Sequence, residues 1–205
     1  MSIPQYQSDG LVDTTTPLDL KSLAGKSVIM TGGASGLGKA YTEAFVKAGA
    51  YVTIADYNEQ AGQETNAEFS GIAAYADQPG SPQYNASKWG VRGLMRNLRR
   101  TAFNENIRVA LVAPWYVKTP ILSSRIIDYL VGKGVKFATV EDCCNAMLRI
   151  ASDKTINGRA FGVVPREESP SGYMDLDHDD YVSGDFMKGW EEIVLDTAQS
   201  ITDLA

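Results

Sequence analysis

A glycine-rich turn between a short apolar segment and a helical segment constrains the fold most strongly. Residues 27–31 have the composition of a buried strand, and the turn that follows contains Gly32, Gly36 and Gly38. Residues 37–46 then have helical composition. Glycines permit a tight turn, and the first turn of a helix presents free N–H groups and a partial positive charge to an anion. The pattern therefore predicts a strand–turn–helix unit that holds a phosphate group, or else a structural turn without a ligand.

A second apolar strand is expected over residues 51–55, and it ends at an acid, Asp56, eighteen residues after Gly38. Residues 58–69 are expected to form a further helix. Strand, helix and strand in this order predict a parallel sheet. A carboxylate at the end of the second strand accepts hydrogen bonds from adenosine ribose hydroxyls and repels a 2′-phosphate. Asp56 therefore favours NAD over NADP, or it is an ordinary residue of a strand-end turn.

Tyr84 and Lys88 lie four residues apart at the start of a helix expected from about Tyr84 to Phe103. That spacing places both side chains on one face of the helix. A nearby ammonium, together with the positive charge of an oxidised nicotinamide, lowers the pKa of a tyrosine and so prepares it for proton transfer. The alternative is an ordinary pair on an amphipathic surface. The helix also carries arginines at positions 92, 96, 99 and 100, which fall largely on one face and are expected to be solvated or at a subunit contact.

The rest of the chain predicts two more strands and one more helix. We expect strands over 107–113 and 159–164, and a helix from Thr139, its cap, to about residue 151. Residues 1–24 are polar and are interpreted as an irregular lead segment. Residues 25–165 form the expected domain. Residues 166–205 hold eleven acids and two basic residues, and are interpreted as a solvated acidic tail.

The composition narrows the function classes. The formal net charge of −6 disfavours nucleic-acid binding, and no apolar run approaches the roughly 18 residues of a membrane span. A single histidine, His178, argues against histidine-rich metal sites, and we expect no metal. The two cysteines, Cys143 and Cys144, are adjacent, so we expect free thiols and a cytoplasmic protein.

These motifs together resemble the short-chain dehydrogenase/reductase family. The family's Thr-Gly-x-x-x-Gly-x-Gly turn matches residues 31–38, and its Tyr-x-x-x-Lys pair matches Tyr84 and Lys88. Its later Pro-Gly-x-x-x-Thr segment is similar to residues 114–119, with Trp115 in place of glycine. Several segments also resemble fungal secondary-metabolite dehydrogenases, such as hydroxyaverantin dehydrogenase, and NAD-dependent 15-hydroxyprostaglandin dehydrogenases.

The resemblance implies an α/β fold, a Rossmann-like doubly wound parallel sheet, and an NAD-dependent oxidoreductase acting on a bulky apolar secondary alcohol or ketone. It implies Tyr84 as the acid/base and Lys88 as the residue that tunes it and anchors the ribose. It also implies a homodimer through the Tyr84 helix. Aromatic residues at 115, 116, 173 and 190 are expected either to pack in the fold or to shape a substrate pocket. The implied cofactor-binding residues are Gly32, Ser35, Gly36, Leu37, Gly38, Asp56, Lys88, Val117 and Thr119.

The resemblance also implies that part of the family fold is missing. Only 28 residues separate Asp56 from Tyr84, whereas three strands, two helices and their loops need on the order of 65. Strands 3–5 of the family order 3-2-1-4-5-6-7 are therefore largely absent, with the junction near residues 69–71. Ser70 at this junction is either the family's catalytic serine or a loop serine. A second interpretation follows: a shortened family member with weak or no cofactor binding and no catalysis.

Overall fold

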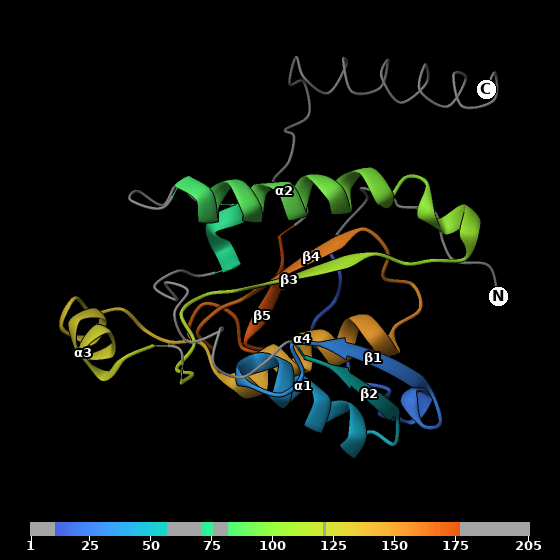
Figure 1. Cartoon of the computed structure of the whole chain (residues 1–205), viewed down its shortest axis with the longest axis horizontal. Helices are drawn as coiled ribbons and strands as arrows, with labels where there is room; N and C mark the ends of the chain where they lie inside the picture. Colours follow the sequence, from blue (N-terminus) through green and yellow to red (C-terminus); the bar gives the residue numbers. More distant parts are fainter. Residues whose placement is uncertain (1–10, 57–70, 76–81, 121, 177–205) are drawn as a thin grey trace, which may run out of the picture.

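The chain forms two small sheets joined by packed helices (Figure 1). The structure, a computed structural model, describes residues 11–56, 71–75, 82–120 and 122–176. Short 3-10 turns are η1 (Leu20–Leu23), η2 (Gly71–Ala74) and η3 (Ala102–Glu105). The main elements in chain order are β1 (Ser27–Thr31), α1 (Gly36–Lys47), β2 (Tyr51–Ala55), α2 (Pro82–Leu98), β3 (Ala110–Pro114), α3 (Ser124–Gly132), α4 (Val140–Ser152), β4 (Arg159–Val163) and β5 (Tyr173–Asp175).

The first sheet pairs β1 with β2 in parallel, and Ile29 lies opposite Thr53 in the register. Val28 and Val52 turn to the face that packs against Phe45 of α1. The other face is open: Ile29 is 75% exposed and Tyr51 is 73% exposed. The predicted strand–helix–strand unit is confirmed, and the described residues cover one face of its sheet.

The second sheet has the order β3-β4-β5, with β3 and β4 parallel and β5 antiparallel to β4. Every residue of β4 is buried, including Phe161 and Val163 at 0% exposure. The strand pairs on both edges, and α2 and α4 pack on this sheet, lying on opposite sides of it (Figure 1). The expected strand 159–164 is therefore confirmed as the centre of the core.

The two sheets meet through helices. Among the described residues, β1 and β3 do not pair with each other, and the first and second sheets are therefore separate. Instead α1 packs on α4, where Tyr41 and Cys143 belong to one apolar cluster with Phe161. The gap that the sequence predicts at the centre of the sheet is present in the described fold.

Helix α2 ends earlier than expected, at Leu98. The chain turns through η3, and Asn106 adopts a left-handed conformation with φ 60°, so β3 begins at Ala110 and not at residue 107. The expectation of a solvated arginine face is wrong at two positions. Arg99 is 3% exposed and donates to the carbonyl of Gly158, and Arg92 donates to the carbonyl of Ala74 while its guanidinium lies over aromatic rings.

The acidic segment begins later than the sequence suggests. Residues 166–176 are docked: Tyr173 is 3% exposed in β5, and Arg166 pairs with the fully buried carboxylate of Asp142. The sequence did not predict β5, because this strand has only three residues and no alternation of apolar and polar residues. Residues 177–205, and the helix expected over 58–69, lie outside the described part of the chain.

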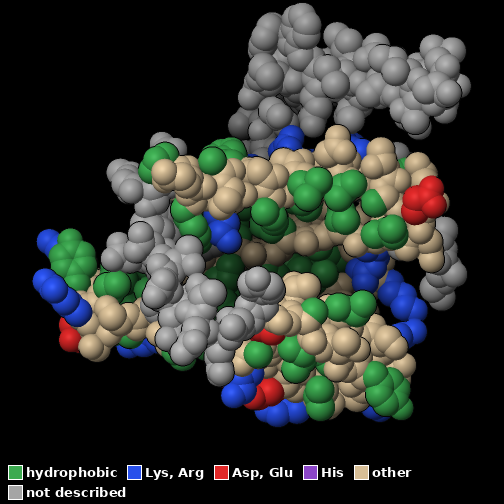
Figure 2. Space-filling model, in the orientation of Figure 1, with side chains coloured by type: hydrophobic (Ala, Val, Ile, Leu, Met, Phe, Trp, Pro, Cys, Tyr) green, Lys and Arg blue, Asp and Glu red, His purple; other side chains and the backbone are tan. Residues whose placement is uncertain are grey.

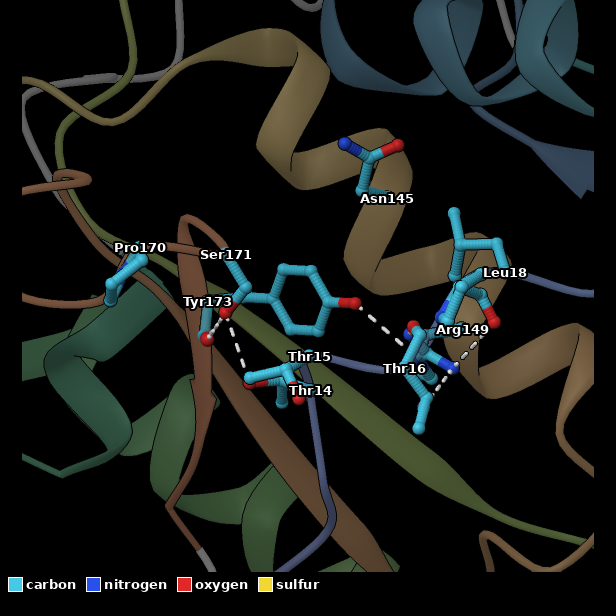
Figure 3. A pocket seen from close by; sticks show the side chains of 10 residues that line it. Thr14, Thr15, Thr16, Leu18, Asn145, Arg149, Pro170, Ser171 and Tyr173 are labelled. Atoms are coloured by element: carbon cyan, nitrogen blue, oxygen red, sulfur yellow. Dashed lines mark hydrogen bonds between the residues drawn. The ribbon is translucent and has the colours of Figure 1, made fainter.

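Residues 11–18 of the lead segment pack against α4 and β5 around a pocket of about 380 Å³ (Figure 3). The buried guanidinium of Arg149 donates to the carbonyls of Thr16 and Pro17, to the Thr16 hydroxyl and to the Tyr173 hydroxyl. On the other side of the Tyr173 ring, the hydroxyls of Thr14 and Ser171 share a hydrogen bond of 3.0 Å. The segment over residues 11–18 has no regular secondary structure and is nevertheless fixed in place.

Candidate functional site

The glycine-rich turn has the conformation that a phosphate-binding turn requires. Gly36 has φ 50°, which L side chains rarely adopt, and a side chain there meets no atom within 4 Å. A Cβ at Gly38 overlaps the carbonyl oxygen of Gly32, so only glycine lets α1 start this close to the turn. Ser35 is the N-cap residue, and its side chain makes no capping hydrogen bond. The turn thus leaves helix N–H groups for an anion.

Asp56 lies against this turn. Its Oδ2 accepts a hydrogen bond of 2.8 Å from the backbone N–H of Ala34, and the residue is exposed. The carboxyl ends of β1 and β2 are further joined by the Gly32 N–H, which donates to the carbonyl of Ala55 at 2.9 Å. The structure therefore brings the acid and the turn together at one edge of the sheet, where ligands of open α/β sheets bind.

Tyr84 is in the first turn of α2, the helix that packs on β3. The chain reverses between α2 and β3, and α2 lies lengthwise over the sheet (Figure 1). Tyr84 is half-buried, and the Lys88 ammonium lies over its ring, 5.1 Å from the centroid. The two side chains share one face of the helix, as their spacing predicts.

The environment of Tyr84 raises its pKa. Burial is the main cause, because it penalises the phenolate, and the nearby Tyr116 hydroxyl adds to the effect. The lowering expected from the sequence requires the charge of an oxidised nicotinamide together with the Lys88 ammonium, whereas burial shifts the pKa in the opposite direction. A neutral Tyr84 at physiological pH holds a proton that it can donate.

The segment that follows β3 is held at both ends. The Trp115 N–H donates to the carbonyl of Val163, and its indole Nε1 donates to the carbonyl of Lys136 at 3.0 Å. Val117 is 7% exposed and bridges Ala138, so its side chain belongs to the core. Thr119 is half-buried, and its carbonyl accepts from the N–H of Leu122.

Apolar packing brings the two parts of the expected cofactor site together. Leu37, at the start of α1, packs against the same cluster of buried residues as Trp115, and Val117 is a member of that cluster. Ser70, the expected third catalytic residue, lies outside the described residues. Sequence analysis missed Phe137, whose ring lies 6.5 Å from that of Tyr116, since it follows α3 without a motif.

Other reactive groups are part of the packing. Cys143 and Cys144 are free thiols, and burial raises the pKa of Cys143 to about 12. The described residues contain no cluster of three metal-ligating side chains, and none of their helices is long and apolar enough to cross a membrane. The pocket at Arg149 shares no lining residue with the Tyr84 site.

Comparisons with known sequences support an oxidoreductase lineage. A profile of the family described as short chain dehydrogenase matches residues 26–78 and, separately, 69–129. The 5'-hydroxyaverantin dehydrogenase of Dothistroma septosporum is 36% identical over 116 residues, which cover 54% of this chain and 36% of that protein. The NADP-dependent dehydrogenase M3 of a Phoma species is 34% identical over 111 residues, or 52% of this chain and 33% of that protein. The matched part is about a third of each relative.

Solved structures support the fold. The L-sorbose reductase of Gluconobacter frateurii, solved with NADPH and L-sorbose, has a TM-score of 0.59 at 16% identity. The alignment covers 71% of this chain and 97% of that chain. An oxidoreductase of the short chain dehydrogenase/reductase family from Burkholderia thailandensis gives a TM-score of 0.55 at 18% identity, over 68% and 91% of the two chains. The expected α/β, Rossmann-like class is confirmed.

Proposed function

Since this chain belongs to the short-chain dehydrogenase family, we propose that it is an NAD-dependent oxidoreductase acting on a bulky apolar secondary alcohol or ketone. The observation that carries the proposal is the place of Tyr84. It lies in the first turn of α2, with Lys88 over its ring and the segment 114–119 beside it.

The residues present fit a dinucleotide. The N–H groups at the start of α1 suit the pyrophosphate, and the open space above Gly32 and Gly36 admits it. Asp56 suits the ribose hydroxyls, provided that its carboxylate releases the N–H of Ala34. A carboxylate there favours NAD, although relatives include an NADP-dependent enzyme. Val117 and Thr119 are proposed to border the nicotinamide.

The chemistry assigned to this chain is proton transfer. When bound, the nicotinamide supplies the hydride acceptor or donor. Tyr84 Oη gives its proton to the carbonyl oxygen of a ketone, or receives the hydroxyl proton of an alcohol in the reverse direction. The raised pKa of Tyr84 keeps it protonated, which suits the donor role. The Lys88 ammonium offsets the phenolate charge that forms when the proton leaves.

The test is NADH-dependent reduction of a panel of apolar ketones by the purified chain. Tyr84→Phe keeps the ring over which Lys88 lies and removes the proton donor, so the rate is expected to fall by 10²-fold or more. Tyr129→Phe on α3 is the matched control, because that tyrosine is 64% exposed and lies outside the site. Full activity of Tyr84→Phe contradicts the proposed mechanism.

A second candidate function follows from the divided sheet. Since β1 and β3 do not pair among the described strands, the glycine-rich turn and the segment after β3 meet through side-chain packing around one apolar cluster. Such a chain can retain its motifs and catalyse nothing. A thermal melt with and without millimolar NAD separates the two candidates. A cooperative transition raised by NAD supports the oxidoreductase, whereas a broad transition indifferent to NAD supports the inactive form.

The partner proposed for either form is a second copy that meets this chain through α2. The helix presents Val91 at 50% and Leu94 at 59% exposure on its outer side. In Figure 2, apolar side chains follow α2 on the face in view. Leu94→Glu is expected to shift the sedimentation coefficient from dimer to monomer, and an unchanged value in that variant contradicts this contact.

A further inference from the structure

Three aromatic side chains, Trp115, Tyr116 and Phe137, form a cluster beside Tyr84. The rings of Trp115 and Tyr116 meet edge to face, with centroids 5.0 Å apart and planes at 75°. The rings of Tyr116 and Phe137 are 6.5 Å apart at 61°. All three residues are half-buried, so each keeps part of its surface open. A group that served only the core is expected to be buried, as Phe161 is.

The cluster is fixed before any ligand arrives. The indole of Trp115 donates to the carbonyl of Lys136, and the carbonyl of Tyr116 accepts from the N–H of Ala138 at 2.9 Å. These bonds join the segment after β3 to the segment after α3. The Lys118 ammonium lies 4.9 Å from the Phe137 centroid and occupies a face of that ring. Tyr116 therefore offers the ring best placed for a ligand.

The cluster lies where a substrate of Tyr84 must lie. Tyr116 is two residues beyond the end of β3, and Tyr84 is in the first turn of α2, the helix that packs on β3. The two hydroxyls are close enough to influence each other electrostatically. A flat ring bonded directly to the reacting carbon can stack on Tyr116 while its oxygen reaches Tyr84. A saturated ring of the same size lacks the π-face that stacking requires.

We propose that the ring of Tyr116, held by Trp115 and Phe137, is a specificity-determining platform that selects ketones and alcohols whose reacting carbon carries an aromatic ring. The proposal rests on the proposed function, because it takes Tyr84 as the group that meets the substrate oxygen. The platform is formed by three residues of this chain, at positions 115, 116 and 137. Stacking of this kind increases affinity about three- to tenfold over a saturated analogue.

The test measures binding and turnover separately. Dissociation constants of 2-acetylnaphthalene and of its decahydronaphthyl analogue are measured by ligand-observed NMR on the chain saturated with oxidised NAD, which cannot reduce the ketone, and turnover is measured separately with NADH. The expected ratio favours the aromatic ketone three- to tenfold in the unaltered chain. It remains in Tyr116→Phe, which keeps the ring, and falls to about one in Tyr116→Leu. Tyr129→Leu, the same change at an exposed ring on α3 with Lys133 over it, is expected to leave the ratio unchanged.

Each outcome distinguishes the platform from the proposed reaction. No preference in the unaltered chain, or an undiminished preference in a folded Tyr116→Leu chain, overturns the platform. A preference that Tyr129→Leu abolishes equally shows adsorption to exposed rings and also overturns it. If the preference follows Tyr116 but no ketone is reduced, the platform stands and the proposed reaction fails. If ketones are reduced without preference, the reaction stands and the platform fails.

Discussion

The β1–β2 sheet and the β3-β4-β5 sheet differ in how completely they are covered. In β4 all five residues are buried, whereas in β1 the exposed and half-buried residues alternate and Ile29 is 75% exposed. The space-filling view shows apolar side chains over both parts of the molecule, with a hollow between them (Figure 2). β1 and β4 are both apolar strands, but their exposure differs because different elements pack around them.

The comparison shows what a neighbour on each edge contributes to a strand. β4 forms hydrogen bonds on both edges and lies in a sheet with helices on both faces, so its side chains are buried. Among the described elements, β1 has one strand neighbour and α1 on one face. An open strand edge beside exposed apolar residues is a site for unwanted pairing, so we expect association to begin at β1. The packing of α1 on α4 is what holds the two parts together.

Truncation in the two sheets gives the largest expected contrast. Phe161→Ala in β4 removes a fully buried ring and is expected to lower the free energy of unfolding by about 3–5 kcal/mol. Ile29→Ala in β1 is expected to change it by less than about 0.5 kcal/mol, because that side chain is already largely in water. Chemical denaturation of both variants measures the contrast. Equal losses mean that β1 is covered in solution, and the comparison fails.

The anchor of the lead segment gives the next largest effect. Arg149→Met leaves the carbonyls of Thr16 and Pro17 without their donor, so a loss of about 1–3 kcal/mol is expected. Hydrogen exchange should rise in β5, against which the segment packs, more than in β1. Arg125→Met on α3 is the control, since that side chain is exposed. Unchanged exchange in β5 shows that the lead segment is not anchored there.

The contact between α1 and α4, where Tyr41 meets Cys143, gives the smallest expected effect, which is a pH dependence of the free energy of unfolding. Burial raises the pKa of Cys143 to about 12 and also raises that of Tyr41, which is hydrogen-bonded to it. Above pH 9 the unfolded thiol loses its proton while the folded one keeps it, so the free energy of unfolding falls as pH rises toward 12. The expected loss is about 1 kcal/mol by pH 10. Thermal melts at pH 8 and pH 10 measure it.

Two variants identify the source of this alkaline loss. Cys143→Ala removes the titrating group, so the stability difference between pH 8 and pH 10 is expected to shrink. Cys144→Ala, at the half-buried neighbour, should reduce it less. If both variants lose the same stability at alkaline pH as the unaltered chain, the α1–α4 contact does not govern the pH dependence.

The sequence by itself determined the local units. The glycine pattern, the strands expected at 27–31, 51–55 and 159–164, and the cap at Thr139 follow from spacing and side-chain type. The structure confirms these elements, with the last strand ending one residue earlier, at Val163. The shared helical face of Tyr84 and Lys88 follows from a spacing of four residues. The missing centre of the sheet follows from the family resemblance together with the short interval between Asp56 and Tyr84. The local units depend on neighbours within a few residues.

Only the tertiary structure decided which edges stay open and which polar groups are buried. Arg99 and Arg149 look like surface residues in the sequence, but carbonyls from distant segments receive their hydrogen bonds. The raised pKa of Tyr84 and the place of Tyr116 beside it depend on how α2 lies over β3. Contacts between residues far apart in the chain set burial and electrostatics, and no local pattern encodes them.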